Sequence, residues 1–584
     1  MRAESTDASL ANGVRPVCRT PALPPRCLRN GTALALLLSI FASSHPARAD
    51  DGSAGTDGQV NFQFALGGGF GGTSVGGAGG AGGTGFTGQA GVDGQNGTGT
   101  GIGAAGGGGG GGGAAGGGAG GAGGLDGNGQ PSGGAGGAGG ANGATNITSV
   151  SSGITISGGI GQDGRSGLLS PSGFGAGGSG GAGAGGYGVV ETTSLTLTNN
   201  GTISGGRPGR GAAGVTGADA GSRSTVDGDG GVGVVFTNGG TLQNFGNISG
   251  GNGDSFSNQT TSKGGAGVVG SNLTIIQGTG TIAGGFGSTP NIAVDFVGGS
   301  NFLQLTTGSS AASFNGLIQI EAGASLTIDQ KTAGQNGTLG SPILSTFAGP
   351  GTLNIDSGTH TLTLGTGLDS GGRTTAFSGT TNLLSGKVSI LNPSALGTGA
   401  VNFLGGLAGN TLEASFFDGA NTGNILTNSS VMIGSGNNAT IESISGHALT
   451  LSGGFTYAGG TGTTLHVGSA TDGGTIIFAP SSLTLDPNGA LSIDGGGLRV
   501  ANATAASQLG GLSSTTIAGG AFLDLNGFAQ TIFVLTGSGA VTNGGGGNPT
   551  LTIANRFAPG AGTPGSSMSI SANLTFQSAA LYLV

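Results

Sequence analysis

Short runs of alternating apolar and small polar residues recur along this chain from about residue 144 to its end, as in Ser194–Thr198 (SLTLT) and Ser325–Asp329 (SLTID). Such alternation places the apolar side chains on one face of an extended strand and the polar ones on the other. Gly-Gly and Asn-Gly pairs separate the runs and allow the positive φ angles of tight corners. The pattern predicts many short strands. No amphipathic helix pattern is evident after residue 49.

The strands belong to a repeat. The tetrapeptide I-[SA]-G-G begins at Ile156, Ile203, Ile248 and Ile282, at strides of 47, 45 and 34 residues. A strand and a polar turn precede each copy. Before three of the copies lies a further apolar element, GYGVV, GVGVVF or GAGVV, and a fourth version follows at Asn291–Phe296 (NIAVDF). One unit therefore consists of three short strands, with glycine-rich loops of variable length after the I-x-G-G corner.

Three strands and three corners make one coil of a parallel β-helix, in which each coil bonds to the next. A lone coil buries too little apolar surface to offset the entropy of ordering it, so the coils must stack. The predicted fold class is all-β, a right-handed parallel β-helix (solenoid) of three-strand coils preceded by a glycine-rich low-complexity segment.

After residue 300 the loops shorten. Strands are predicted at Ser325–Asp329, Thr352–Asp356, Thr361–Leu364, Lys387–Leu391, Thr464–Val467, Thr475–Phe478, Leu483–Asp486 and Leu491–Asp494. Their spacing of about 8–12 residues also fits a sandwich or barrel. The repeated outward Thr, Ser, Asn and Asp favour the β-helix.

The segment Gly67–Gly143 contains little but glycine and alanine. Glycine loses the most backbone entropy on ordering and has no side chain to bury, so we expect a flexible or loosely looped stretch. Collagen is excluded, since no strict G-x-y period with abundant proline is present. The predicted domains are a signal peptide (1–49), a short N-terminal segment (50–66), the low-complexity region (67–143), and two β-helix regions (144–300 and 301–584).

The N-terminus has the pattern of a secretory signal. Arginines precede an apolar run, Thr32–Ala42 (TALALLLSIFA), and Ala47-Arg-Ala49 precedes Asp50. A basic region, about ten apolar residues and an A-x-A site predict cleavage between Ala49 and Asp50. The run is too short for a membrane-spanning helix, which needs about 20 apolar residues. Export implies two partners, the Sec machinery and signal peptidase.

The composition of the exported part argues against disulfide bonds and against nucleic-acid binding. Both cysteines, Cys18 and Cys27, lie in the leader, so no disulfide is expected in the oxidising compartment beyond it. Removing residues 1–49 leaves 10 of the 16 basic and 23 of the 25 acidic residues, a net charge of −13. Nucleic-acid binding requires clustered Lys and Arg. No such cluster remains, so we expect no nucleic-acid partner.

The last 140 residues resemble the passenger domains of bacterial autotransporters, the surface β-helices of type V secretion. The resemblance rests on Ala448–Leu465 (ALTLSGGFTYAGGTGTTL), which is similar to the autotransporter-associated β-strand repeat. It extends to Leu523–Ile532, Leu535–Gly545, Ala558–Gly565 and Asn573–Phe576. The I-S-G-G units are similar to the same passengers more loosely. The resemblance implies a cell-surface or secreted β-helix associated with the outer membrane, and adhesion to a host or cell-surface glycan or protein.

The family pattern continues into a membrane barrel of about ten-residue strands with aromatic girdles. Here the sequence ends at Val584 without such a pattern and contains no Trp. The expectation is that an outer-membrane translocator barrel is supplied elsewhere, or that the chain is an inert fragment of a disrupted autotransporter gene.

Short motifs give little sign of chemistry. Gly177-Gly-Ser179-Gly-Gly181 matches G-x-S-x-G without the strand-turn-helix context of a nucleophile. Gly158–Ser166 is a single imperfect copy of a calcium-binding nonapeptide, with Asp163 as its acidic residue. Asp227 and Asp229 form a pattern more typical of a solvated turn than of a metal site.

A polysaccharide-cleaving β-helix, a lyase or hydrolase, is the enzymatic alternative. Such enzymes cluster Asp carboxylates, or Lys or Arg with calcium. The candidates Asp356, Asp486, Asp494 and Asp524 each end or interrupt a strand singly, although stacking could align them. His360, His447 and His466 lack metal-ligand spacing. We therefore predict a non-enzymatic stalk or adhesin, with no catalytic, cofactor or metal residues.

Cleavage of the signal peptide can be tested on the exported protein. The mature protein is expected to begin at Asp50, because the A-x-A site fixes the position of the cut. N-terminal sequencing of the exported product checks this directly. A product that retains its apolar run would contradict the signal-peptide interpretation.

Overall fold

The computed structural model describes residues 95, 119, 121–125, 129–130, 133–168, 179–212, 227–253, 262–288, 291–306, 313–339, 347–365, 377–415, 425–426, 428–506, 509–560 and 566–583. All of them belong to the unit Ala49–Val584. The predicted signal peptide 1–49 and the segment 50–66 lie outside the described residues, so both stay predictions.

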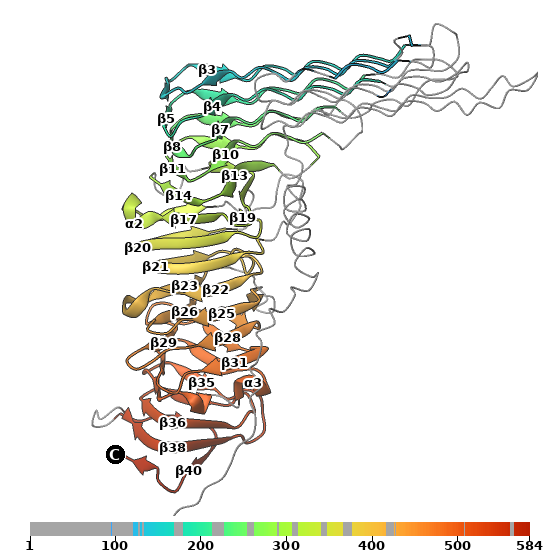
Figure 1. Ribbon diagram of the computed structural model, residues 1–584. Coiled ribbons are helices and arrows are strands. Elements are labelled where there is room, and N and C mark those ends of the chain that lie inside the picture. The colour runs from blue at the N-terminus through green and yellow to red at the C-terminus, as the bar shows by residue number, and fades with distance from the viewer. Residues whose placement is uncertain are drawn as a thin grey trace, which may run out of the picture. The chain divides into compact units, whose positions relative to one another are not determined.

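The described chain is a parallel β-helix, as the alternation predicts (Figure 1). In its first part each coil adds one strand to each of three sheets. One sheet contains β1 (Ala144–Thr145), β4 (Val189–Glu191), β7 (Val234–Phe236), β10 (Val268–Ser271), β13 (Ile292–Gly298), β16 (Leu317–Ile320) and β19 (Phe347–Ala348). A second contains β3 (Thr155–Ser157), β6 (Thr202–Ser204), β9 (Asn247–Ser249), β12 (Thr281–Ala283) and β15 (Ser313–Asn315).

A third sheet runs through the whole stack. It begins with β2 (Ser149–Val150), β5 (Thr196–Asn199), β8 (Gly240–Asn244), β11 (Leu273–Gln277), β14 (Ser300–Leu305), β17 (Ser325–Asp329), β18 (Gly337–Leu339), β20 (Thr352–Leu364) and β21 (Thr380–Ile390). Two rows of strands follow β21, because both β22 and β23 pair with it. One row is β22 (Ala400–Phe403), β25 (Ser430–Ile433), β28 (Gly454–Tyr457) and β31 (Ser482–Leu485).

The other row is β23 (Asn410–Ala414), β26 (Ala439–Ser443), β29 (Thr464–Val467), β32 (Ala490–Ile493), β34 (Ser514–Ile517), β36 (Gln530–Gly537), β38 (Thr550–Pro559), β40 (Asn573–Phe576) and β41 (Leu581–Tyr582). A fourth sheet closes these coils with β24 (Ile425–Leu426), β27 (Ala448–Leu451), β30 (Thr475–Phe478), β33 (Gly497–Val500), β35 (Phe522–Asp524), β37 (Ala540–Thr542) and β39 (Ser569–Ile570). The helices among the described residues are single turns, α2 (Gln330–Ala333), α3 (Ala503–Ala506), η2 (Gly406–Ala408) and η3 (Leu509–Gly511).

The I-x-G-G repeat sets the register of the early coils. Ile156 pairs with Ile203, Ile203 with Ile248, and Ile248 with Ile282. The fourth apolar element, NIAVDF, was also assigned correctly, since Val268 pairs with Val294. The strands predicted after residue 300 are confirmed too, some of them merged into the longer β20 and β21.

Stacked aliphatic side chains fill the interior. Leu197, Leu242, Ile275 and Leu303 are paired in this order and are at most 1% exposed. Each coil thus places its inward side chains directly on those of the next, which supplies the burial that a single coil lacks.

Two amide ladders accompany this apolar interior. Inside the stack, Asn199 Nδ2 donates to Asn244 Oδ1 at 2.9 Å, and Asn244 Nδ2 donates to Gln277 Oε1 at 3.2 Å. All three side chains are fully buried. On the outside, Asn402 Nδ2 donates to Asn382 Oδ1, and Asn382 Nδ2 donates to Asn354 Oδ1, both at 2.9 Å. A buried side-chain amide finds its hydrogen-bond partner only when the neighbouring coil is in the correct register. The inner ladder therefore holds neighbouring coils in one alignment.

The described parts of the glycine-rich segments between the second and the first sheet bond to one another. We call them arms: outgoing arms leave β3, β6, β9 and β12 (158–168, 205–212, 250–253 and 284–288), and returning arms lead to β1, β4, β7 and β10 (133–143, 179–188, 227–233 and 262–267). Figure 1 shows the arms of successive coils side by side. They bond laterally through main-chain groups, although none of them is a β-strand.

The bonding of the arms has a period of three. In the first outgoing arm, the N–H groups of Gly158, Gly161 and Gly164 donate at 2.9 Å to the next outgoing arm. The following residues, 159, 162 and 165, donate at 2.7–2.8 Å to the returning arm 133–143. The third residues of these triplets, Ile160, Asp163 and Ser166, are exposed. A repeat of three residues in an extended chain is the period of a polyproline-II-like conformation.

Glycine is required because the arms lie so close together. A Cβ on Gly161 would lie 2.2 Å from the Gly183 carbonyl oxygen, and one on Gly183 would lie 2.0 Å from that of Ala138. Most residues of the predicted low-complexity region 67–143 lie outside the described ones, so the expectation of a flexible or loosely looped stretch stays a prediction, while residues 133–143 bond to the neighbouring arms. The entropy that glycine loses is offset by main-chain hydrogen bonds that no larger residue could approach closely enough to make.

Gly183→Ala tests this packing. The methyl group would push apart the arms 133–143 and 179–188, so we expect faster amide hydrogen exchange across 158–165 and 179–188, measured by mass spectrometry. Gly511→Ala is the control, because its Cβ would meet nothing closer than 3.9 Å. Equal exchange in both variants would contradict a close-packed array.

Asn244→Ala tests the inner ladder. It leaves buried amide groups of Asn199 and Gln277 without their partners, at about 1–3 kcal/mol for each unsatisfied group. We expect the opening free energy of the amides in β5 and β8 to fall by about 2–4 kcal/mol in hydrogen exchange. Asn382→Ala in the part-exposed outer ladder should cost less than about 1 kcal/mol, because water replaces the lost bonds.

Candidate functional site

A cluster of charged side chains spans several successive coils on the outside of the third sheet. Lys387 in β21 forms ion pairs with Glu413 in β23, with Glu442 in β26 at 2.9 Å, and with Asp472 after β29 at 3.6 Å. Strand register positions two of these carboxylates, since Glu413 pairs with Glu442. Glu413 and Glu442 are only 8% and 3% exposed although they point away from the interior.

The ammonium and the carboxylates stabilise each other's charge. Burial alone would lower the pKa of Lys387, but hydrogen bonds to Glu413 and Glu442 outweigh it and hold this pKa well above its ordinary value. Burial would likewise raise the pKa of Glu413, yet hydrogen bonds from Lys387, Ser415 and Ser389 lower it. Both groups therefore stay ionised at neutral pH.

The same carboxylates form the group most suited to a metal ion among the described residues, with one oxygen each of Glu413, Glu442 and Asp472 within 4.8 Å of one another. The Lys387 ammonium, however, lies where a cation would bind. A divalent ion would have to displace a group that already has three carboxylate partners. The cluster is therefore best described as an internal ion-pair network that links the coils.

Four of the carboxylates and histidines singled out in the sequence lie in pairs beside this network or on its neighbouring coils. His466 Nδ1 lies 2.6 Å from Asp494 Oδ2 on the adjacent strand. Arg499 Nε donates to Asp524 Oδ2 at 2.8 Å, and Asp356 lies 4.0 Å from Lys331. Hydrogen bonds from the backbone of Gly544 and from Arg499 outweigh burial and lower the pKa of Asp524.

The remaining candidates serve local structure. Asp486 Oδ1 accepts the N–H of Asn488 within its own turn. His360 lies within β20, and His447 precedes β27. Ser179, from the G-x-S-x-G match, is buried at the start of a returning arm.

The carboxylates of the suspected calcium motifs hold the arms together. Asp163 Oδ1 accepts the backbone N–H of Arg210 at 2.7 Å. Asp227 Oδ1 accepts the N–H of Gly211, and Asp229 Oδ1 that of Lys263, both at 2.8 Å. Each therefore connects one arm to another.

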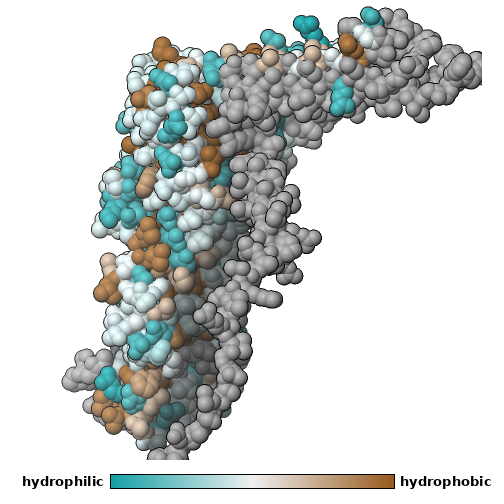
Figure 2. Space-filling model, viewed as in Figure 1, coloured by the Kyte–Doolittle hydropathy of each residue, from teal (hydrophilic) through white to brown (hydrophobic). Residues whose placement is uncertain are grey.

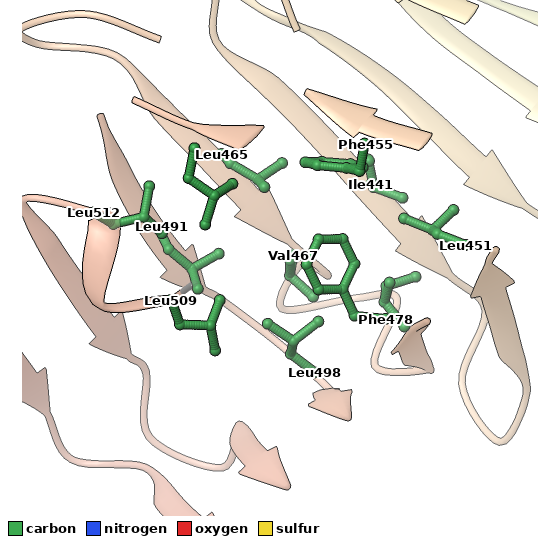
Figure 3. A pocket seen from close by; sticks show the side chains of 12 residues that line it. Ile441, Leu451, Phe455, Leu465, Val467, Phe478, Leu491, Leu498, Leu509 and Leu512 are labelled. Atoms are coloured by element: carbon green, nitrogen blue, oxygen red, sulfur yellow. The ribbon is translucent and has the colours of Figure 1, made fainter. Parts of the chain in front are cut away.

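An apolar cavity of about 20 Å³ lies inside the later coils, lined by side chains that include Phe455, Phe478, Leu491 and Leu512 (Figure 3). Its size is close to the minimum for one water molecule, and it offers no polar partner to hold one. The cavity is a gap between stacked side chains rather than a ligand site.

Comparison of the chain with protein-family models, curated proteins and solved structures finds no match. The similarity to autotransporter passengers therefore remains a prediction. None of the described helices is long and apolar enough to cross a membrane.

Sequence reasoning missed the Lys387 network. The available signal was a repeated tripeptide, Thr411-Leu-Glu413 and Thr440-Ile-Glu442, in which one acidic residue occupies the same place in two successive coils. Asp472 carries no such signal, because it enters from a loop.

Lys387→Met tests the network. The variant leaves buried carboxylates without a cation and should lose about 2–3 kcal/mol of stability at pH 7, less than for a fully buried pair because the Lys387 side chain is 31% exposed. Lys331→Met, whose lysine is 65% exposed, should change stability by less than about 0.5 kcal/mol. Urea unfolding of both variants measures the difference.

The pH dependence should change sign between parent and variant. In the parent, the lowered pKa of Glu413 contributes stability above pH 4.5 that is lost as pH falls through the folded-state pKa, and the raised pKa of Lys387 contributes stability lost only above pH 10.5. In Lys387→Met, unpaired buried carboxylates favour protonation, so acidification from pH 7 to 5 should stabilise it. Parallel pH profiles would contradict the ion-pair network.

Proposed function

We propose that this chain is a non-catalytic, exported surface β-helix of the autotransporter-passenger type, which serves as an adhesin or structural stalk. The signal pattern ending at Ala49 supports export, and the cysteine-free sequence after it is compatible with a second membrane crossing in an unfolded state. The parallel stack from β1 to β41 supports the stalk, because each coil extends the one before it.

The arms carry the adhesin part of the proposal. Loops that only connect strands would not need the lateral bonding seen between 158–168, 179–188 and 205–212. An ordered array keeps outward side chains in fixed positions, which reduces the entropy cost of contact with a partner. The expected partner is a host or cell-surface glycan or protein, and an outer-membrane translocator barrel would complete secretion.

A secreted polysaccharide lyase or hydrolase is the second candidate. One observation favours it: Lys387, Glu413, Glu442, His466 and Asp494 place acid–base groups on neighbouring coils. Against it, the charges are already paired with one another. Incubation with polysaccharides, with and without calcium, separates the two functions by release of unsaturated or reducing ends.

Surface labelling tests the proposal. Antibodies to the β-helix should bind intact cells of the source bacterium, and external protease should remove the signal. Replacing 207–231 by a short Gly-Ser connection shortens one pair of arms while keeping β6 and β7, and should reduce attachment without reducing display. Labelling only after permeabilisation would reject surface display, and absence of any product would support the inert fragment.

A further inference from the structure

One carboxyl group lies inside the β-helix instead of on its outside. Hydrophilic side chains are spread over the visible outer face of the coils (Figure 2). Glu191, the last residue of β4, is by contrast 0% exposed. It points to the same side of the strand as Val189, which is buried in the interior, and it pairs with the buried Phe236 of β7. Its carboxyl group therefore lies among apolar side chains, where the ionised form is costly.

The carboxyl group of Glu191 is bonded to the first coil, which we define as β1, β2 and β3. Glu191 Oε1 accepts the N–H of Ile147 at 2.9 Å, in the turn between β1 and β2. Glu191 Oε2 is buried without a hydrogen-bond partner among the residues described. A buried carboxylate normally requires a cation or several hydrogen bonds, and a single backbone donor is a poor substitute.

The described elements around Glu191 supply no balancing charge. The strands β1, β2, β5 and β7 and residues 146–148 contain only Ala, Asn, Ile, Leu, Phe, Ser, Thr and Val. Asp295 in β13 lies in the outward row of the same sheet, on its opposite face and three strands away. The buried Glu413 and Asp524 differ from Glu191, because each of them forms an ion pair with a cation.

Burial raises the pKa of Glu191, although the hydrogen bond from Ile147 opposes this effect. The closed coil therefore favours the protonated acid. The resulting stability is fully present below the ordinary pKa of 4.5 and is lost as pH rises through the pKa of the closed form. Opening of the first coil exposes the carboxyl group to water, so ionisation shifts the equilibrium toward the open form.

Short strands hold the first coil in place. β1 and β2 each pair at two positions with the second coil, β1 with β4 and β2 with β5. We propose that Glu191 is a pH-sensitive latch for the first coil: its protonated form keeps residues 144–150 on the second coil, and its ionisation releases them. Release leaves the edges of β4 and β5 unpaired, and such edges are templates for pairing with another strand. The inference does not depend on the adhesin function.

Hydrogen exchange of the exported chain between pH 5 and pH 8, followed by mass spectrometry, tests the latch. Each rate is divided by the intrinsic rate of the same amide at that pH. The amides of Asn146, Thr198 and Asn200 report on opening, because each bonds to a carbonyl group of the other coil. Their protection should fall about tenfold for each pH unit until Glu191 ionises in the closed coil, and by at least about tenfold in total.

Two variants make the test specific. Glu191→Gln keeps an acceptor for the Ile147 N–H but cannot ionise, so the reporting amides should keep their pH 5 protection up to pH 8. Glu321→Gln, in the half-buried turn after β16, is the matched control and should retain the pH dependence of the parent. The Thr306 amide, which bonds to Gln277 in later coils, should stay equally protected in all three proteins and shows that they are folded.

Three results would overturn the proposal. The first is equal protection of the reporting amides at pH 5 and pH 8 in the parent. The second is a Glu191→Gln variant with the pH dependence of the parent, since another group would then control the opening. The third is weaker protection in Glu191→Gln at both pH values with Thr306 unchanged, because the carboxyl group would then act through its shape and not through its proton.

Discussion

Lateral main-chain hydrogen bonding between successive coils is the interaction on which this structure depends. In the β-helix it takes the form of parallel strand pairing, and it places Leu197, Leu242 and Ile275 on top of one another. In the arms the same direction of bonding continues without strands, through glycine chains that repeat every three residues. The two parts differ in what fills the space between chains: aliphatic side chains in the β-helix, and the backbone itself in the arms.

Charge is distributed according to the same stacking. Residues at equivalent places in neighbouring coils are brought within a few ångströms, so like charges such as Glu413 and Glu442 would repel each other unless a cation lay between them. Lys387 supplies that cation. It lies in β21, two residues before Ser389, which pairs with Glu413 in β23. A repeat protein with few charged residues must place each of them with regard to the coil above and below.

Much of the fold could be predicted because its rules are local. Alternation identified β17, β29 and β30, and the recurring Ile at residues 156, 203 and 248 gave the register. The inward amides of Asn199 and Asn244 follow the same period of two, but residue type suggested an outward position. Their burial becomes acceptable only when the next coil provides a partner, which a single stretch of sequence does not reveal.

The arms were harder to predict for a related reason. Glycine content indicates high entropy, and the compensating bonds come from segments about 45 residues away, as between Gly161 and Arg207. The Lys387 network likewise depends on coil lengths and on a loop residue, Asp472. Sequence reasoning thus succeeded where one strand contains the information and failed where several coils share it.

The triplet period of the arms has a consequence for how such a protein can change. Two positions of each triplet are fixed by contact between backbones, whereas side chains at the third position lie on the outside, where Asp163 and Asn252 accept the N–H of a neighbouring arm. Substitution of an exposed third-position residue such as Ile160 leaves the main-chain bonds of the array intact. Insertion or deletion of a whole triplet would lengthen or shorten an arm by about 9 Å and keep the period of its bonding. The arms therefore separate an architecture fixed by the backbone from a surface whose chemistry and reach can vary, one triplet at a time.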